Sequence, residues 1–331
     1  MANITVYSVQ NLKDVDYKIF SGLYNDFKSR AISDFKFDLE PLEYEDFISA
    51  IENNLLTCLV LLENSIPTGY LIYTTLVSYS LELNIIYLIS DENYEAKIRY
   101  LMDEFFKNEA ELINNKVITY PLLGEQEKYK NVLYEYGFKD VSQSVLKFDF
   151  SNPSNIAKLN KARDLEISWE YRFVNWDDMY FNEVVKTIHN NFKDMNDALF
   201  DPRFKTIKGV EDIVSKITNS TYGEFLPQYT KLAFKDNILA SVCFVNVTGN
   251  SLVNIPLVAV EKPYRHQKLG EKITSLAVRE VFKDILDGKT EYSEINVTTD
   301  TFNTAAMRMY KYCGFEEDYQ YIQSYREQSR N

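Results

Sequence analysis

An internal repeat constrains the fold of this 331-residue chain more than any other feature. In the first half, the spacing of apolar residues predicts a strand, two helices, three strands, a helix, a strand, a helix and a strand. They fall at residues 4–9, 12–30, 42–54, 57–62, 70–75, 83–89, 93–112, 116–120, 125–136 and 143–150. The same order returns from residues 167–174 to a last strand near residues 318–325. The repeat length is about 175 residues.

This order of elements predicts an α/β fold with two tandem domains, each a mixed, mostly antiparallel sheet flanked by helices. We expect the first domain at residues 1–150 and the second at residues 166–331. The polar, turn-rich segment Ser151 to Asn155 opens an expected linker at residues 151–165. Two domains also agree with the usual domain size.

The net charge of −13 argues against a nucleic-acid or anionic-membrane partner, because binding phosphates needs clustered Lys and Arg. Residues 1–150 hold 13 basic and 24 acidic side chains, whereas residues 151–331 hold 23 and 25, so the second half is far less acidic. No apolar stretch is long enough for a membrane span, and the start, Met1 to Thr5, does not resemble a secretory signal. We therefore expect a cytoplasmic protein.

Cysteine and histidine are scarce. Cys58, Cys243 and Cys313 lie far apart, and we expect three small core residues rather than a disulfide, a metal site or a nucleophile. His189 and His266 are the two histidines, which leaves a zinc or triad enzyme poorly supplied. We expect no metal.

The stretch from Val258 to Phe315 has the pattern of an anion-binding site. An apolar run enters the short loop Tyr264-Arg265-His266-Gln267-Lys268-Leu269-Gly270, and an amphipathic helix leaves it. Backbone N–H groups at a helix N-terminus are unpaired and lie at the positive end of the helix dipole, so this arrangement suits a pyrophosphate.

This loop, together with Asn303, Ala306 and the ending Tyr310-Lys311-Tyr312-Cys313-Gly314-Phe315, resembles the acyl-CoA-binding and carboxy-terminal motifs of the GNAT acyltransferase superfamily. The resemblance covers the second copy well and the first copy only by element order and ending. It implies acetyl-CoA as acyl donor and Tyr310 as general acid toward the departing thiolate. The remaining implied cofactor-binding residues are Val258, Ala259, Val260, Arg265, His266, Gln267, Lys268, Leu269, Gly270, Glu271, Asn303 and Ala306.

The loop departs from the family pattern at two positions. Lys268 stands at the first glycine position and His266 where glycine is common, while Gly270 keeps the second glycine. A side chain at residue 268 can be accommodated if its φ is negative, and its ammonium is then available for a phosphate contact.

The first copy lacks these features. Aligned on Gly-Phe, Leu133 falls opposite Tyr310 and Gln126 opposite Asn303, and the loop Ser90 to Glu95 has three acids and no glycine. We interpret it as a degenerate copy that either builds part of the substrate pocket or takes the place of a dimer partner. The chain is then expected to be a monomer with an intramolecular pseudo-dimer of domains.

The function expected from this resemblance is acetyl-CoA-dependent N-acetylation of a primary amine on a small molecule, by direct attack in a ternary complex. Alternatives are a non-catalytic acyl-CoA-binding or interaction module, and tRNA-dependent aminoacyl transfer, which the acidic surface disfavours. A general base is not placed; Glu224, Asp300 and Glu294 are candidates. The residues expected to meet the amine are Asp194, Asp197, Asp201 and Glu224.

Overall fold

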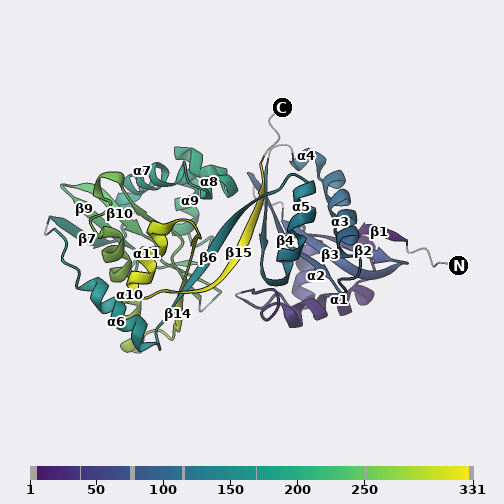
Figure 1. The fold of residues 1–331 in the computed structure, drawn as a ribbon, viewed down its shortest axis with the longest axis horizontal. Helices are drawn as coiled ribbons and strands as arrows, with labels where there is room; N and C mark the ends of the chain where they lie inside the picture. The colour runs from purple at the N-terminus through teal and green to yellow at the C-terminus, as the bar shows by residue number, and fades with distance from the viewer. Residues whose placement is uncertain are drawn as a thin grey trace. The chain divides into compact units, whose positions relative to one another are not determined.

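The structure, a computed structural model, describes residues 6–37, 39–74, 79–113, 116–168, 170–249 and 252–327. The expected strand start at residues 4–5, Thr75 and Trp169 lie outside the described residues, as does the start of the chain on which the cytoplasmic expectation rests. The chain forms two compact units (Figure 1). Unit 1 comprises Met1–Val141, Leu199–Asp201 and Tyr321–Asn331, and unit 2 comprises Ser142–Ala198 and Pro202–Gln320.

Unit 1 contains one sheet with helices on both faces. Its strands follow the order β1, β2, β3, β4, β5 and the end of β15, and the pairing is antiparallel except between β4 and β5. The strands are β1 (Tyr7–Asn11), β2 (Thr57–Glu63), β3 (Ile66–Thr74), β4 (Ser80–Leu88), β5 (Val117–Leu122) and β15 (Glu316–Arg326). The helices are α1 (Tyr17–Arg30), α2 (Tyr44–Glu52), α3 (Tyr94–Asn108), α4 (Ala110–Ile113) and α5 (Lys130–Glu135), with 3-10 turns η1 (Leu12–Asp14) and η2 (Gly124–Tyr129).

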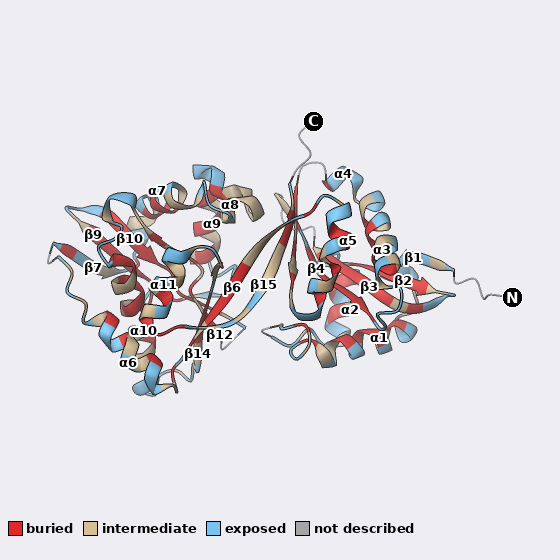
Figure 2. Cartoon of the chain, viewed as in Figure 1, coloured by how far each residue is buried: buried red, intermediate tan, exposed pale blue. Residues whose placement is uncertain are grey.

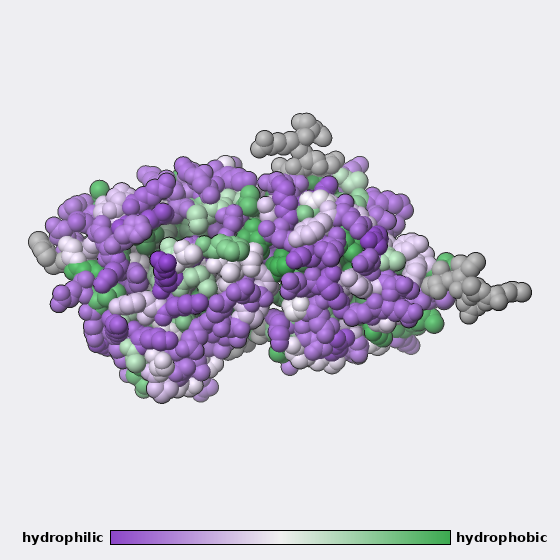
Figure 3. All heavy atoms as spheres, viewed as in Figure 1, coloured by the Kyte–Doolittle hydropathy of each residue, from purple (hydrophilic) through white to green (hydrophobic). Residues whose placement is uncertain are grey.

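Alternation along the strands of unit 1 supplies a core on each face of the sheet. On β2, Leu59 and Leu61 pack in the core formed with α3 and α5, whereas Cys58 and Val60 pack in the core formed with α1 and α2. Figure 2 shows these strands buried between partly exposed helices. Figure 3 shows a largely hydrophilic surface, as the helices turn their polar faces to solvent.

Unit 2 repeats this order with two of its strands interrupted. The antiparallel strands β7, β9, β10 and β13 form one part of the sheet, and β8, β11, β12, β14 and β6 form the other. These strands are β6 (Lys139–Asp149), β7 (Tyr171–Asn175), β8 (Glu224–Phe225), β9 (Lys231–Lys235), β10 (Ile238–Cys243), β11 (Asn246–Thr248), β12 (Leu252–Asn254), β13 (Val258–Val260) and β14 (Glu294–Asp300). The helices are α6 (Pro153–Arg163), α7 (Phe181–Phe192), α8 (Asp197–Phe200), α9 (Ile207–Thr218), α10 (Leu269–Leu286) and α11 (Thr304–Cys313), with 3-10 turns η3 (Asp178–Tyr180), η4 (Pro202–Lys205) and η5 (Lys262–Tyr264).

The predicted fold class and repeated element order are confirmed. Two features differ in detail. Helix α6 occupies most of residues 151–165, and its Leu159 and Ala162 are buried in the core shared with α10. The boundaries of the compact units also differ from residues 150 and 166. Strand β6, at the end of the first half of the sequence, pairs with β14 in unit 2, and the end of β15, the last strand of the second half, pairs with β5 in unit 1.

The three cysteines are buried and free, as predicted. Within the described residues, no helix combines the length and the apolar character needed to cross a bilayer. The same part of the chain holds no group of three His, Cys, Asp or Glu side chains placed to hold a metal ion.

Candidate active site

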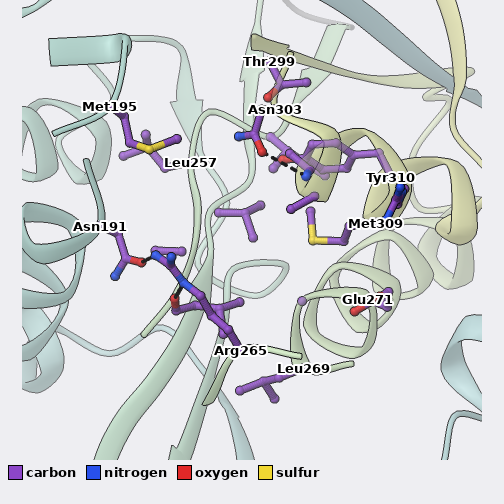
Figure 4. A pocket seen from close by; sticks show the side chains of 18 of the residues that line it. Asn191, Met195, Leu257, Arg265, Leu269, Glu271, Thr299, Asn303, Met309 and Tyr310 are labelled. Atoms are coloured by element: carbon purple, nitrogen blue, oxygen red, sulfur yellow. Dashed lines mark hydrogen bonds between the residues drawn. The ribbon is translucent and has the colours of Figure 1, made fainter. Parts of the chain in front are cut away.

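Unit 2 contains a cavity of about 540 Å³ at the place where its sheet divides. Strand β12 pairs in parallel with β14 at Val253↔Ile295 and Asn254↔Asn296, and the chain then crosses to pair as β13 with β10. Beyond Asn296, β14 continues along β6 alone. The cavity therefore opens between β13 and the end of β14 (Figure 4).

Strand β13 presents a free backbone edge to this cavity. It is the terminal strand of its four-strand group, with β10 on one side. In an antiparallel pair alternate residues bond to the partner. Glu261 N donates to Ala240 O, and Phe244 N donates to Leu257 O. Residues 257 and 261 therefore bond to the β10 side, and by alternation so does Ala259, which lies between them opposite Val242. The N–H and C=O groups of Val258 and Val260 therefore face away from β10.

The loop after β13 ends in a helix N-terminus without a side-chain cap. Lys268 is the N-cap of α10, and no side chain bonds to the first turn. The first bond to the Lys268 carbonyl comes from Lys272 N. Among the described residues, the N–H groups of Leu269, Gly270 and Glu271 consequently have no acceptor. These groups and the helix dipole favour an anion at this end of the cavity.

The condition stated for a side chain at Lys268, a negative φ, is not met. Its φ is 59° and that of His266 is 63°, both in the left-handed region. The two side chains thus stand at positions where the backbone has the conformation that glycine adopts most easily. This explains why glycine is common at both positions in the family that the loop resembles.

Gly270 packs closely against α11. A Cβ atom at this position would lie 2.7 Å from the Met309 sulfur, so the flexible Met309 side chain would have to shift. Arg265 fastens the loop to its surroundings: its Nε donates to the Val260 carbonyl at 3.0 Å and its Nη2 to the Asn191 side chain at 2.6 Å. Figure 4 shows this pair beside β13.

Helix α11 brings Asn303 and Tyr310 to the other side of the cavity. The Asn303 side chain caps the helix by accepting from Ala306 N at 3.1 Å. Tyr310 is 5% exposed, and its ring packs edge-on against Phe315 at 5.6 Å. Burial is the main cause that raises the pKa of the phenol, and Cys243, Cys313 and Asp197 add to it. The raised pKa keeps the phenol neutral near pH 7, and no described residue hydrogen-bonds to its hydroxyl.

Most residues singled out from the sequence line this cavity. Those that do are Val258, Ala259, Val260, Arg265, His266, Lys268, Leu269, Gly270, Glu271, Asn303, Ala306, Tyr310 and Asp197. Gln267 does not, because its side chain accepts from the Tyr171 hydroxyl at 2.8 Å and donates to the Pro263 carbonyl.

The other expected substrate residues are not brought to the cavity. Asp194 is exposed and is not among the lining residues, and Asp201 belongs to unit 1. Glu224 is exposed on β8, opposite Val247. Of the other candidate bases, Glu294 forms an ion pair with Lys147 at 3.4 Å, and Asp300 accepts from Asn196 and from Phe302 N.

Sequence reasoning missed other residues that line the cavity. They come from the end of α7 and the segment after it, the crossing between β12 and β13, the end of β14, and α11. These residues are Asn191, Phe192, Met195, Ile255, Pro256, Leu257, Thr298, Thr299, Thr304, Ala305, Arg308 and Met309. Two apolar residues, Phe192 at the end of α7 and Met195 after it, were the available signal.

Unit 1 offers an internal comparison. Ile66 in unit 1 and Ile238 in unit 2 each follow a turn of two residues with positive φ. Five residues after Ile66, Leu71 pairs with Ile86. Five residues after Ile238, Cys243 pairs with Val258. Ile86 therefore corresponds to Val258.

In unit 1 the backbone N–H at this position already has a hydrogen-bond acceptor within the protein. Ile86 N donates to the Tyr120 hydroxyl at 2.8 Å, and Tyr120 in turn donates to the Gln126 side chain. Tyr120 and Gln126 are fully buried, and β4 is uninterrupted. The backbone donor that is free in unit 2 is thus occupied in unit 1 by side chains.

Comparisons with known proteins agree on the fold. No protein-family model matches the chain, and no curated protein matches its sequence. A GCN5-related N-acetyltransferase from Sphaerobacter thermophilus superposes with a TM-score of 0.61 at 11% identity, over 100% of this chain and 98% of the other. A tandem GNAT protein from the clavulanic acid biosynthesis pathway gives 0.57 at 11%, over 99% and 100%.

A third structure shares the fold as part of a longer protein. It is a GCN5-related glucosamine N-acetyltransferase region of a fungal multi-domain β-N-acetylglucosaminidase, with a TM-score of 0.60 at 13% identity over 98% of this chain and 38% of the other. At such identities the likeness establishes the fold alone. With its two units of repeated element order and its match to a tandem GNAT protein along almost the whole chain, this protein has the GNAT fold in tandem.

Proposed function

We propose that the protein is an acetyl-CoA-dependent N-acetyltransferase that acts on a primary amine of a small molecule, by direct attack in a ternary complex. One observation carries the proposal. The free edge of β13, the uncapped N-terminus of α10 and the Tyr310 side chain all meet in one cavity. Structures that share the fold are described as N-acetyltransferases, which supports the same reading.

The residues present suit an elongated ligand with amides at one end and phosphates at the other. Val258 offers its N–H and C=O groups and Val260 its N–H to amides, as a further strand would use them, whereas the Val260 carbonyl already accepts from Arg265 Nε. The N–H groups at Leu269 to Glu271 suit a pyrophosphate, and the exposed Lys268 ammonium adds positive charge beside them. In the first copy the corresponding backbone N–H is not free, because Ile86 N donates to the Tyr120 hydroxyl. We therefore assign one site per chain.

The chain's own groups then perform the transfer. Bound acetyl-CoA supplies a thioester carbonyl, which an unprotonated amine attacks. The N–C bond forms, the C–S bond breaks, and the Tyr310 phenol donates a proton to the departing sulfur. The amine nitrogen loses one proton, which restores the phenol through solvent. Burial keeps the Tyr310 pKa raised, so the phenol is protonated throughout the neutral range.

A second function, acyl-CoA binding without catalysis, has one observation in its favour. Lys268 and His266 hold left-handed backbone where glycine is common, so the loop departs from the family pattern where a phosphate would bind. This function predicts acetyl-CoA binding without release of free CoA thiol in the presence of any amine.

Calorimetric titration with acetyl-CoA, followed by an assay of CoA thiol release with a panel of amines, tests both functions. We expect one site per chain and amine-dependent thiol release. Lys268→Glu places a negative charge at the uncapped helix end and should weaken binding about tenfold or more. Asp91→Ala, in the equivalent loop of unit 1, is the matched control and should leave binding unchanged. Two equivalent sites would contradict the assignment to unit 2, and absence of binding would end the proposal.

A further inference from the structure

The cavity of unit 2 is lined by residues from both faces of the sheet. Side chains alternate between the two faces along a strand. Around β13, Val258 and Val260 pack against the core formed with α10. Leu257 and Ala259 are instead buried in the core formed with α7 and α9, and all four residues line the cavity. The α10 face leads to the helix end that we assign to phosphates, which leaves the α7 face for the acceptor.

Strand β14 contributes polar side chains to the α7 face. Ile295 and Val297 are buried in the core formed with α10. By alternation, Asn296 and Thr298 face the α7 side. Thr298 is exposed and lines the cavity, whereas Asn296, two residues earlier on the same face, is 4% exposed. The polar side chains therefore begin at the cavity wall and continue into the interior.

The amide of Asn296 is buried without a hydrogen-bond partner. Among the described residues, neither its nitrogen nor its oxygen meets one. Its neighbours across the sheet are Asn254 and Lys147. The Asn254 nitrogen donates to the Thr248 hydroxyl at 3.0 Å, and Lys147 forms an ion pair with Glu294 at 3.4 Å. An unpaired buried polar group costs stability, and in native proteins such groups commonly bind a water or a ligand.

Apolar side chains lie in the same part of the cavity. Phe192 stacks on Phe204 at 5.0 Å between ring centres, and Leu257 is 8% exposed. Met195 is 40% exposed and has an adaptable side chain. Figure 4 shows Met195 and Leu257 on the opposite side of the cavity from the α10 N-terminus. We call Phe192, Met195 and Leu257 the apolar end of the cavity.

We propose that the acceptor is a primary amine that carries hydroxyl groups on an otherwise apolar carbon frame, as amino alcohols and amino sugars do. Its hydroxyls bind Thr298 and the Asn296 amide, and its C–H surface packs on Met195 and Leu257. This inference rests on the proposed function and names the substrate class of the same site.

A hydroxyl matches these protein groups because it both donates and accepts. The Asn296 amide has a donor side and an acceptor side, and the Thr298 hydroxyl has both properties. None of these groups is charged, so a hydroxyl pairs with them without burying an unpaired charge. A hydroxyl bound at Thr298 reaches the deeper amide directly or through one bridging water. The hydroxyls do not react, since the neutral amine and acetyl-CoA give the N-acetyl amide and CoA thiol.

The first test compares amines of equal shape at saturating acetyl-CoA. The pair is trans-2-aminocyclohexanol and trans-2-methylcyclohexylamine, in which a methyl group replaces the hydroxyl. Rates are compared per unprotonated amine, because a hydroxyl lowers the basicity of a neighbouring amine. We expect kcat/KM for the amino alcohol to be at least about tenfold higher, the effect of one hydrogen bond to a buried group or more. A ratio near one or below would overturn the inference.

The second test removes the buried amide. Asn296→Leu keeps the size of the side chain, and we expect it to raise the midpoint of thermal unfolding, because an unpaired buried polar group is lost. It should also reduce the preference for the amino alcohol to about threefold or less. A lower midpoint with an unchanged preference would show that the amide has only a structural role.

Two further positions serve as independent checks. Thr298→Val should also reduce the preference, whereas Thr298→Ser keeps the hydroxyl and should retain it. Asn84→Leu in unit 1 is the matched control, because the Asn84 amide oxygen is also buried without a partner among the described residues. It should leave the preference unchanged. If Asn296→Leu does not fold, the amine pair and the Thr298 variants decide the question.

The outcomes are distinguishable from those of the proposed function. Acetyl-CoA binding with equal or preferred acetylation of the methyl analogue would overturn this inference and leave the acetyltransferase standing. Absence of acetyl-CoA binding, or binding without acetylation of any amine, would end the proposed function and this inference together.

Discussion

At the scale of single residues, Lys268 is one of the non-glycine residues with a left-handed backbone. A left-handed conformation costs an L-residue with a Cβ about 1–2 kcal/mol, and Lys268 has a φ of 59°. We expect Lys268→Gly to raise the free energy of unfolding by about 0.5–1 kcal/mol and Lys268→Val to lower it by about 1 kcal/mol, since a β-branched residue tolerates this conformation worst. Urea unfolding of the three proteins measures the difference. Equal stability of the glycine and valine variants would contradict the left-handed conformation.

Tyr310 allows a test in which the fold is kept. Removing its hydroxyl leaves the ring against Phe315, and no described residue loses a hydrogen bond. We expect Tyr310→Phe to lower kcat about a hundredfold or more with little change in the acetyl-CoA Kd, because the proton donor to the sulfur is lost. Stopped-flow or steady-state thiol release measures kcat. Unchanged turnover would show that water protonates the sulfur.

The pKa of Tyr310 also gives a sign for the pH dependence. Burial raises its folded pKa above the ordinary value of 10.0, so folding favours the neutral phenol. The stabilisation is complete below pH 10 and is lost as pH rises above it, because the unfolded state ionises first. Across pH 7 to 9 the rate should therefore rise as the amine deprotonates, without a fall due to Tyr310.

At the scale of elements, the crossing from β12 to β13 creates the site, and its backbone alternation is testable by proline. The N–H of Val258 faces the cavity, whereas Ala259 bonds to Val242 on β10. Proline is tolerated in an edge strand where its nitrogen faces outward. Val258→Pro should therefore abolish acetyl-CoA binding at nearly full stability, while Ala259→Pro should destabilise the fold by at least about 2 kcal/mol. Calorimetry and thermal unfolding provide the two measurements. The reverse order of stabilities would refute the alternation.

The sequence predicts the features that depend on residues within one segment, and it misses those that depend on packing between distant segments. The order of helices and strands follows from periodicity in each segment, and the loop from Arg265 to Gly270 was recognised by its own residues. The apolar end of the cavity was not predicted, because Phe192 and Leu257 meet only after α7 and β13 pack on β10. The left-handed φ at Lys268 was not predicted, because a lysine ordinarily has a negative φ.

At the scale of the whole molecule, the two halves of the sequence exchange their last strands. The first half supplies β6 to unit 2, and the second half supplies the end of β15 to unit 1. Within unit 2, β6 residues Gln143 to Asp149 pair with β14. Within unit 1, β15 residues Ile322 to Arg326 pair with β5. This pairing was not predictable from the sequence, because both strands have the same alternating pattern and either would complete either sheet.

The exchange predicts that the halves depend on each other for folding. A chain of residues 1–150 lacks the β15 partner of β5, and a chain of residues 151–331 lacks the β6 partner of β14. Each would expose an unpaired strand edge that promotes aggregation. We expect neither half to be soluble and cooperatively folded alone, but co-expression should give a one-to-one complex that binds acetyl-CoA once, because β6 and β15 remain able to pair across the cut. Co-purification, circular dichroism and calorimetry measure this. Two halves that each unfold cooperatively alone would contradict it, since each sheet would then be complete without the strand from the other half.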